Sequence, residues 1–218
     1  MSQLIRLSST TSGQELLSHI GLSIPTQVNE PEPLPQHLHA EITGLPFPRN
    51  MHPVHNQTRR RARAQALLKA ADQHATDVVF VDATKYVDKP YFAAAAVTPD
   101  GTAVNAFPVR TQKACEAEQV AIALALALPQ HDTIFTDSKR AALAYRRGTL
   151  CQAALRVLAS VQITVDKHIY WFPGHEGINI QPGVPNGIAL AHNLARDFTC
   201  RGGSRSGSLA GDTNTYQE

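Results

Sequence analysis

A short apolar run at residues 78–84 places the strongest constraint on the fold of this chain. The run reads Val-Val-Phe-Val-Asp-Ala-Thr, and its largely β-branched, apolar character predicts a central strand buried on both faces. Asp82 lies near its end. A buried carboxylate raises the free energy of the folded state unless a cation or hydrogen-bond donors replace its lost hydration. Asp82 is therefore either a strand-end residue that turns the chain or part of a site.

Length and composition limit the class of protein. The chain has 218 residues, enough for one ordinary domain with appendages or two small domains, and its formal net charge of +2 does not by itself indicate a nucleic-acid partner. The three cysteines, Cys115, Cys151 and Cys200, are widely spaced and match neither a disulfide framework nor a metal motif.

No part of the sequence indicates a membrane or secretory segment. The longest apolar run, residues 120–128, is too short to span a bilayer, and the N-terminus lacks the apolar region of a signal peptide. We therefore expect an intracellular protein, cytoplasmic or nuclear, that is not secreted and has no membrane partner.

Composition divides the chain into four parts. They are a weakly patterned segment, a basic helix, a folded domain and a polar tail, over residues 1–50, 51–75, 76–200 and 201–218. The first part holds a candidate helix over 13–21 and a Pro-rich stretch over 25–48 that is typical of an extended linker. The basic helix has four arginines that either contact phosphates or lie on a solvated face, namely Arg59, Arg60, Arg61 and Arg63. The Gly- and Ser-rich tail is predicted to be disordered.

The pattern within residues 76–200 predicts a mixed sheet. Three strands come first, over 78–84, 91–97 and 102–109, and the Pro99-Asp-Gly101 turn indicates an antiparallel meander. The expected elements that follow are a helix, a strand, two helices, a bent strand and a last helix, over 114–128, 133–136, 138–147, 150–160, 162–172 and 188–200. This order is typical of an α/β fold with a five-stranded mixed sheet, in which the meander is joined by two parallel strands and flanked by helices.

Two further acidic residues lie where elements leave the same core. Glu118 lies three, four and seven residues before apolar residues of its helix, so its side chain either faces the sheet or reaches solvent at the edge of the apolar stripe. Asp137 follows the strand 133–136 and begins a helix, where Asp is also a favoured N-cap. The carboxyl end of a strand in an α/β sheet is, however, where ligands bind. If the first and fourth strands are parallel neighbours, Asp82 and Asp137 meet at one edge.

Three carboxylates in a partly buried cleft repel one another and have raised pKa values. Divalent cations resolve this conflict, because Mg²⁺ and Mn²⁺ take hard oxygen ligands. Two such ions about 4 Å apart can activate a water molecule and stabilise the leaving oxygen of a phosphodiester. The acidic trio therefore predicts a site that holds Mg²⁺ or Mn²⁺, with two ions.

The segments around the trio resemble the motif series of type 1 ribonuclease H domains. In chain order they are Val81-Asp-Ala-Thr84, Ala117-Glu-Gln-Val-Ala-Ile122, Thr136-Asp-Ser138 and Trp171-Phe-Pro-Gly-His-Glu-Gly177. Each is weak alone, but four in order over residues 76–200 are specific. The resemblance implies a ribonuclease H-like fold, metal ligation by Asp82, Glu118 and Asp137, and hydrolysis of the RNA strand of RNA–DNA hybrids. It also implies that His175 assists proton transfer or product release, where the alternative is an ordinary exposed loop histidine.

More narrowly, the chain resembles ribonuclease H domains at the end of non-LTR (LINE-type) retrotransposon polyproteins. The phrases Ala121-Ile-Ala-Leu124 and Leu194-Ala-Arg196 carry this resemblance, and His52-Pro with Arg59-Arg-Arg-Ala-Arg63 resembles the linker after a reverse transcriptase. It implies that the chain is part of a larger polyprotein and that the first 60 residues are a stub of that connection.

One position departs from the family pattern. The family closes with Gly-Asn-Glu-x-Ala-Asp, and counting back from residues 194–196 puts His192 at the Asp position, with Ile188 and Ala189 at the Asn and Glu positions. A neutral imidazole ligates Mn²⁺ more readily than Mg²⁺. His192 is therefore either a fourth, catalytic ligand or a helix-face histidine. We expect the substrate's phosphates and 2′-hydroxyls to be contacted by Thr84, Ser138, Lys139 and Asn186.

Two functions are consistent with these residues. The first is a metal-dependent endonuclease that acts on RNA–DNA hybrids, which the intact acidic trio favours. The alternative is a nucleic-acid-binding domain with a ribonuclease H fold and weakened catalysis, which His192 favours. A general exonuclease of the wider superfold fits less well, because such enzymes lack the Trp-Phe-Pro-Gly-His loop.

Overall fold

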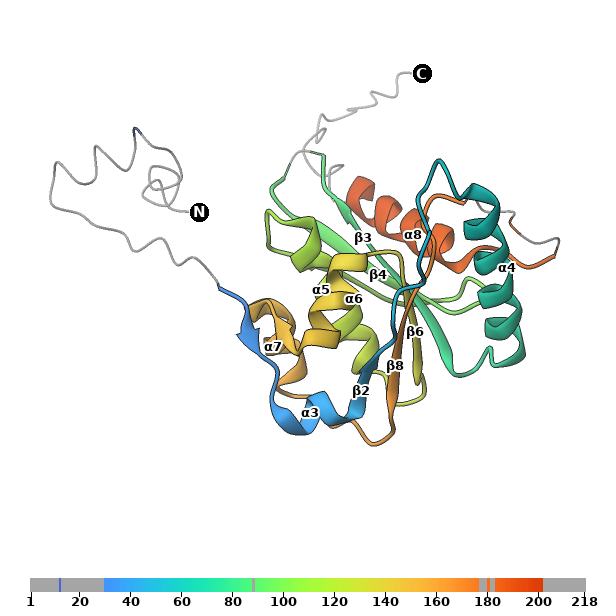
Figure 1. Cartoon of the computed structure of the whole chain (residues 1–218). Helices are drawn as coiled ribbons and strands as arrows, with labels where there is room; N and C mark the ends of the chain where they lie inside the picture. The colour runs from blue at the N-terminus through green and yellow to red at the C-terminus, as the bar shows by residue number, and fades with distance from the viewer. Residues whose placement is uncertain (1–11, 13–29, 88, 177–179, 181–182, 202–218) are drawn as a thin grey trace, which may run out of the picture. The chain divides into compact units, whose positions relative to one another are not determined.

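The computed structural model describes residues 12, 30–87, 89–176, 180 and 183–201 (Figure 1). The chain divides into two compact units, Met1–Glu30 and Pro31–Glu218, and the helices and strands given below lie in the second. The helix expected over 13–21 and the tail from residue 202 lie outside the described residues, so both stay predictions.

A mixed sheet lies at the centre of the second unit. Within the described residues it has six strands in the order β2-β8-β6-β3-β4-β5. Their bounds are Ile42–Gly44 (β2), Val78–Lys85 (β3), Phe92–Val97 (β4), Ala103–Val109 (β5), Thr133–Thr136 (β6) and Lys167–Trp171 (β8). The strands β3, β4 and β5 form an antiparallel meander, β6 runs parallel to β3, and β8 runs parallel to β6 and β2. The predicted α/β class with a mixed sheet is confirmed.

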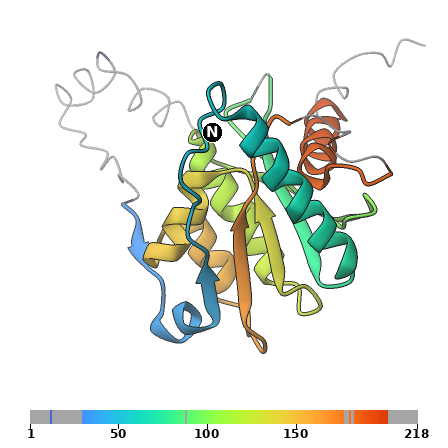
Figure 2. The same ribbon diagram turned by 45° about the vertical axis from the view of Figure 1, so that its right-hand side comes forward.

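Helices flank both faces of this sheet (Figures 1 and 2). One face carries α5 (Ala114–Leu126), α6 (Lys139–Arg147) and α7 (Gln152–Leu158), and the other carries α4 (Gln57–Gln73) and α8 (Gly187–Arg201). Along β3, Val79 and Val81 pack on the α5 side, whereas Phe80 packs on the α4 and α8 side. This alternation explains why the central strand is an unbroken apolar run, because both of its faces are covered.

The alanines of β4 pack against helices on both faces of the sheet. Alanine is a weak strand former, but all six residues of β4 are buried. Ala94 and Ala96 pack on the α5 side, and Ala93 and Ala95 pack on the α8 side. Short side chains here allow a helix to lie close on each face. Gly187 acts in the same way at the start of α8, because a Cβ there would lie 2.2 Å from Cδ2 of the Phe80 ring.

The segment expected to be a linker is part of the fold. Residues 31–48 contain β1 (Glu32–Pro33), α3 (Gln36–Glu41) and β2, and Leu34, Leu38 and Ile42 are buried in the core on the α5 side. The expected linker over 25–48 and the expected five-stranded sheet are therefore corrected for these residues. The physical reason is the edge of β8, whose backbone groups pair with β2 instead of facing solvent.

Two smaller differences concern the second half of the chain. Residues 162–165, expected as the start of a bent strand, have no regular structure, and β8 begins at Lys167. The short strand β7 (Thr149–Leu150) between α6 and α7 was not expected; it pairs antiparallel with β1. Among the helices that the structure describes, none is long and apolar enough to cross a membrane.

Candidate metal centre

Carboxylates from three elements converge at one edge of the sheet. Asp82 lies on β3, Asp137 directly follows β6, and Glu118 lies on α5. The parallel register pairs Val81 with Thr136, so the two aspartates each come one residue after a paired position. One carboxylate oxygen from each of the three residues lies within 4.8 Å of the other two. The convergence of these side chains, predicted from strand order and helical spacing, is confirmed.

Burial and mutual repulsion make this cluster costly to ionise. Asp82 is 5% exposed and Glu118 is 8% exposed, and Asp137 is half-buried. Burial, followed by the charges of Asp82 and Asp137, raises the pKa of Glu118 well above its ordinary value, against a backbone hydrogen bond from Ala83 that lowers it. Burial and the charge of Asp82 raise the pKa of Asp137 to about 6, and the imidazoles of His175 and His192 act in the opposite direction.

The residues of the cluster fit a divalent cation. The Oε2 atom of Glu118 is buried and has no hydrogen-bond partner among the described residues. A buried acceptor of this kind is rare in folded proteins and calls for a missing partner. Three convergent carboxylates, one with an unpaired oxygen, form the hard oxygen donor set that Mg²⁺ and Mn²⁺ prefer. Asp82, Glu118 and Asp137 can therefore hold a metal ion.

His192 reaches this site from α8 through one member of the cluster. Its Nδ1 atom lies 2.9 Å from Oδ2 of Asp82, and its side chain is 52% exposed. The hydroxyl of Thr84 donates to the same Asp82 oxygen at 3.4 Å and also lies 3.4 Å from His192 Nδ1. The structure thus places His192 beside the carboxylates as a partner of Asp82.

The loop after β8 forms the opposite wall of the site. The indole Nε1 of Trp171 donates to the backbone oxygen of Asp137 at 2.9 Å, which ties the end of β8 to the start of α6. His175 is exposed, and its backbone has the left-handed φ of 61°. Gly174 lies against Asp137 so closely that a Cβ would be 2.3 Å from the Oδ2 atom. A side chain at this position would displace the Asp137 carboxylate.

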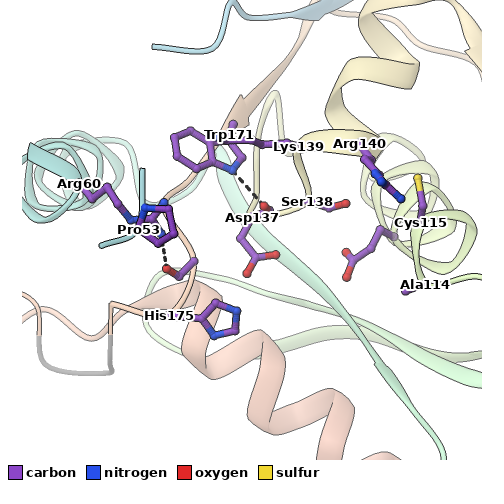
Figure 3. A pocket seen from close by; sticks show the side chains of 12 residues that line it. Pro53, Arg60, Ala114, Cys115, Asp137, Ser138, Lys139, Arg140, Trp171 and His175 are labelled. Carbon is purple, nitrogen blue, oxygen red and sulfur yellow. Dashed lines mark hydrogen bonds between the residues drawn. The ribbon is translucent and has the colours of Figure 1, made fainter. Parts of the chain in front are cut away.

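An open cleft of about 500 Å³ lies over Glu118 and Asp137 (Figure 3). Its floor is acidic and its walls are basic, since Lys139 and Arg140 from the first turn of α6 line it together with Arg60 from α4. The ammonium of Lys139 lies 4.4 Å from the centroid of the Trp171 ring. A cleft whose floor can hold a metal ion and whose walls are cationic suits a substrate with phosphate groups.

The four residues expected to contact substrate lie in different settings. Ser138 and Lys139 line the cleft, although the Ser138 hydroxyl also accepts from the Ala141 amide as the N-cap of α6. Thr84 is held against Asp82 and His192, as described above. Asn186 is 1% exposed, and its Oδ1 accepts from the Ile188 amide at the start of α8. Asn186 therefore has a structural role at the start of α8 that the sequence did not indicate.

Arg60 and Arg140 are cleft residues that the sequence did not single out for this site. Arg140 follows Lys139 in the first turn of α6. The basic pair directly after Asp137-Ser138 is the sequence signal that could have identified Arg140 as a residue of this site. Arg60 belongs to the basic helix that was expected either to contact phosphates or to face solvent. It is 7% exposed and bonded within the protein, so the expectation that it faces solvent is wrong, whereas contact with phosphates stays a prediction.

We expect Gly174→Ala to weaken metal binding about 10- to 100-fold, the usual range for disturbing a group that supports a ligand. The added methyl group would displace the Asp137 carboxylate from its position beside Glu118 and Asp82. Calorimetric titration with Mn²⁺ measures the affinity, and circular dichroism with thermal unfolding verifies that the variant is folded. A folded variant with unchanged Mn²⁺ affinity would show that Asp137 does not need its present position.

The comparisons with known proteins add no relative: no family model matches the chain, and no curated protein matches it.

Proposed function

We propose that this protein is a divalent-metal-dependent endonuclease that hydrolyses the RNA strand of RNA–DNA hybrids. The observation that carries the proposal is the convergence of Asp82, Glu118 and Asp137, with an unpaired buried oxygen on Glu118, beside a cleft with cationic walls that Glu118 and Asp137 line. The sheet supports it as well. Five of its strands form the antiparallel meander and the two parallel strands that the resemblance to type 1 ribonuclease H domains implies.

Each part of the cleft has a role in this reaction. Asp82, Glu118 and Asp137 would hold the metal, which when bound supplies an activated water and neutralises charge on the phosphodiester. Lys139 and Arg140 lie where they can attract the phosphate backbone of the substrate. Hydrolysis joins a water oxygen to phosphorus and breaks the bond to the 3′-oxygen of the RNA. That leaving oxygen takes up a proton, which His175 can deliver from the facing loop.

A second candidate is a nucleic-acid-binding domain of the same fold with weakened catalysis. The contact between His192 and Asp82 favours it, because the imidazole engages a carboxylate oxygen of a candidate metal ligand. Asp82, Glu118 and Asp137 are compatible with either function. A measurement of metal binding therefore distinguishes the two functions more directly than the fold does.

The test is cleavage of a hybrid labelled on either strand by the purified full chain. We expect cleavage of only the RNA strand, dependent on Mg²⁺ or Mn²⁺ and abolished by a chelator or by Asp137→Asn. DNA and RNA duplexes of the same sequence are the matched controls and should stay intact, because the proposal requires both a 2′-hydroxyl on the cut strand and a DNA partner. Cleavage of the DNA duplex would contradict the substrate assignment. Hybrid binding without cleavage in either metal would favour the second candidate.

A further inference from the structure

Helix α4 reaches the active-site loop through one buried guanidinium. Arg60 is 7% exposed although it lies in the arginine-rich start of a helix. Its Nη2 donates to the backbone oxygen of Gly174 at 2.7 Å, and its Nε donates to Oε1 of Glu176 at 2.8 Å (Figure 3 draws the first of these bonds). One side chain therefore holds both sequence neighbours of His175.

The remaining contacts of Arg60 leave its guanidinium committed to the protein. Its Nη1 donates to the backbone oxygen of Met51 at 3.2 Å, and its carbon Cζ lies 5.7 Å from the centroid of the Trp171 ring. All three guanidinium nitrogens thus donate to protein oxygens. A planar guanidinium presents its donors in a fixed fork, so these bonds define its orientation. Arg60 is consequently a poor candidate for a phosphate ligand, even though it lines the cleft.

The backbone of His175 needs such support. A φ of 61° is uncommon for a residue with a side chain, and such positions persist only where the surroundings hold them. Gly174 on one side is confined between the Arg60 guanidinium and the Asp137 carboxylate. Glu176 on the other side is held by its ion pair with Arg60, in which both side chains are 8% exposed. The loop is therefore fixed at the two points that flank the strained residue.

We infer that Arg60 is a positioning residue for His175, and that α4 is for this reason part of the active site. The kinetic part of this inference rests on the proposed nuclease function, whereas its structural part does not. Without the guanidinium, the loop relaxes from the left-handed conformation and the imidazole leaves its place facing the cleft. The metal-binding carboxylates come from other elements, so the inference concerns the proton-handling side of the site.

The kinetic test compares Arg60→Lys with the wild-type protein. Lysine keeps the charge but cannot make the fork of bonds, so we expect kcat for hybrid cleavage to fall about 10- to 100-fold, with little change in KM. Lys69→Ala, an exposed residue of the same helix, is the matched control and should leave both constants unchanged. A change confined to KM would instead mean that Arg60 binds substrate, and the inference would be wrong.

A double-mutant cycle with His175→Ala tests whether the loss of kcat in Arg60→Lys depends on His175. If Arg60 acts by placing His175, then Arg60→Lys should not slow a protein that already lacks the imidazole. Independent, multiplicative losses in the two variants would overturn the inference. Glu176→Gln gives a milder second perturbation, because it removes the charge of the partner while the bond to Gly174 stays, and a smaller loss of kcat is expected.

A measurement that does not depend on enzymatic activity separates this inference from the proposed function. Backbone chemical shifts report the sign of φ, so those of His175 can be followed by NMR in the metal-free protein. We expect the left-handed signature in the wild-type protein and in Lys69→Ala, and its loss in Arg60→Lys. An unchanged signature in Arg60→Lys contradicts the inference whether or not the protein cleaves hybrids. A protein that never cleaves them, yet loses the signature in Arg60→Lys, would retain the positioning role and lose only the proposed function.

Discussion

Replacing Glu118 with glutamine should lower the rate of hybrid cleavage by at least about 100-fold and should also stabilise the metal-free protein. The loss of activity follows from removal of a candidate metal ligand, since disturbing even a group behind a ligand costs about 10- to 100-fold. The gain in stability follows from burial and repulsion, which raise the pKa of Glu118 in the folded protein. A neutral amide removes that repulsion and can donate to the neighbouring carboxylates, so we expect the variant to be more stable than the wild type at pH 7.5.

Glu116→Gln is the matched control on the same helix. Glu116 lies two residues before Glu118 but points elsewhere, bonded to the Lys113 ammonium at 2.9 Å and the Thr111 hydroxyl at 2.6 Å. We expect this variant to keep its activity and to lose little stability, because a surface ion pair contributes little. Urea unfolding in the presence of a chelator measures both stabilities. An active Glu118→Gln protein, or one less stable than the wild type, would contradict the metal-site interpretation.

The second large effect concerns pH and Asp137. Its pKa is raised from 3.8 to about 6 in the folded metal-free protein, so the folded state holds this proton more tightly than the unfolded state does. The stability that this provides is present below about pH 4 and is lost as pH rises through about 6. A difference of about two pKa units corresponds to about 3 kcal/mol. Asp137→Asn should therefore be more stable than the wild type at pH 7.5, with the advantage disappearing towards pH 4.

A bound metal should reverse this pattern in the wild-type protein alone. Mg²⁺ or Mn²⁺ binds the ionised carboxylates of the folded state, so adding either ion at pH 7.5 should raise the midpoint of unfolding. The same addition should have little effect on Asp137→Asn. Unfolding curves measured between pH 4.5 and 7.5, with and without the ion, give both comparisons. An equal metal effect in the two proteins would show that Asp137 is not a ligand.

The acidic cluster was predictable from the sequence because each member has a fixed place relative to a regular element. Asp82 and Asp137 each come one residue after the last paired positions of the neighbouring parallel strands β3 and β6, and Glu118 keeps helical spacing with the apolar face of α5. These are local relations, and the periodicity of strands and helices converts them into positions in space.

The role of Arg60 was not predictable in this way. Its partners at Gly174 and Glu176 are more than a hundred residues away, and a run of arginines at a helix start gives no sign of which one turns inward. The strand β2 was hidden for a different reason. It has only three residues after a Pro-rich stretch, and its pairing with β8 depends on an edge that exists only in the folded sheet.

That pairing also has a consequence for the order in which the protein assembles. The strand β2 lies near the start of the compact unit, and its neighbour β8 lies near the end, so the two can join only after nearly all of the intervening chain has left the ribosome. Contacts between such distant residues form late, because the chain loses the entropy of a long loop before it gains any energy from pairing. Until β8 has joined the sheet, the edge of β6 stays open to other chains. During synthesis, the elements that carry Asp82, Glu118 and Asp137 are therefore complete while the β6 edge of the sheet is still unprotected.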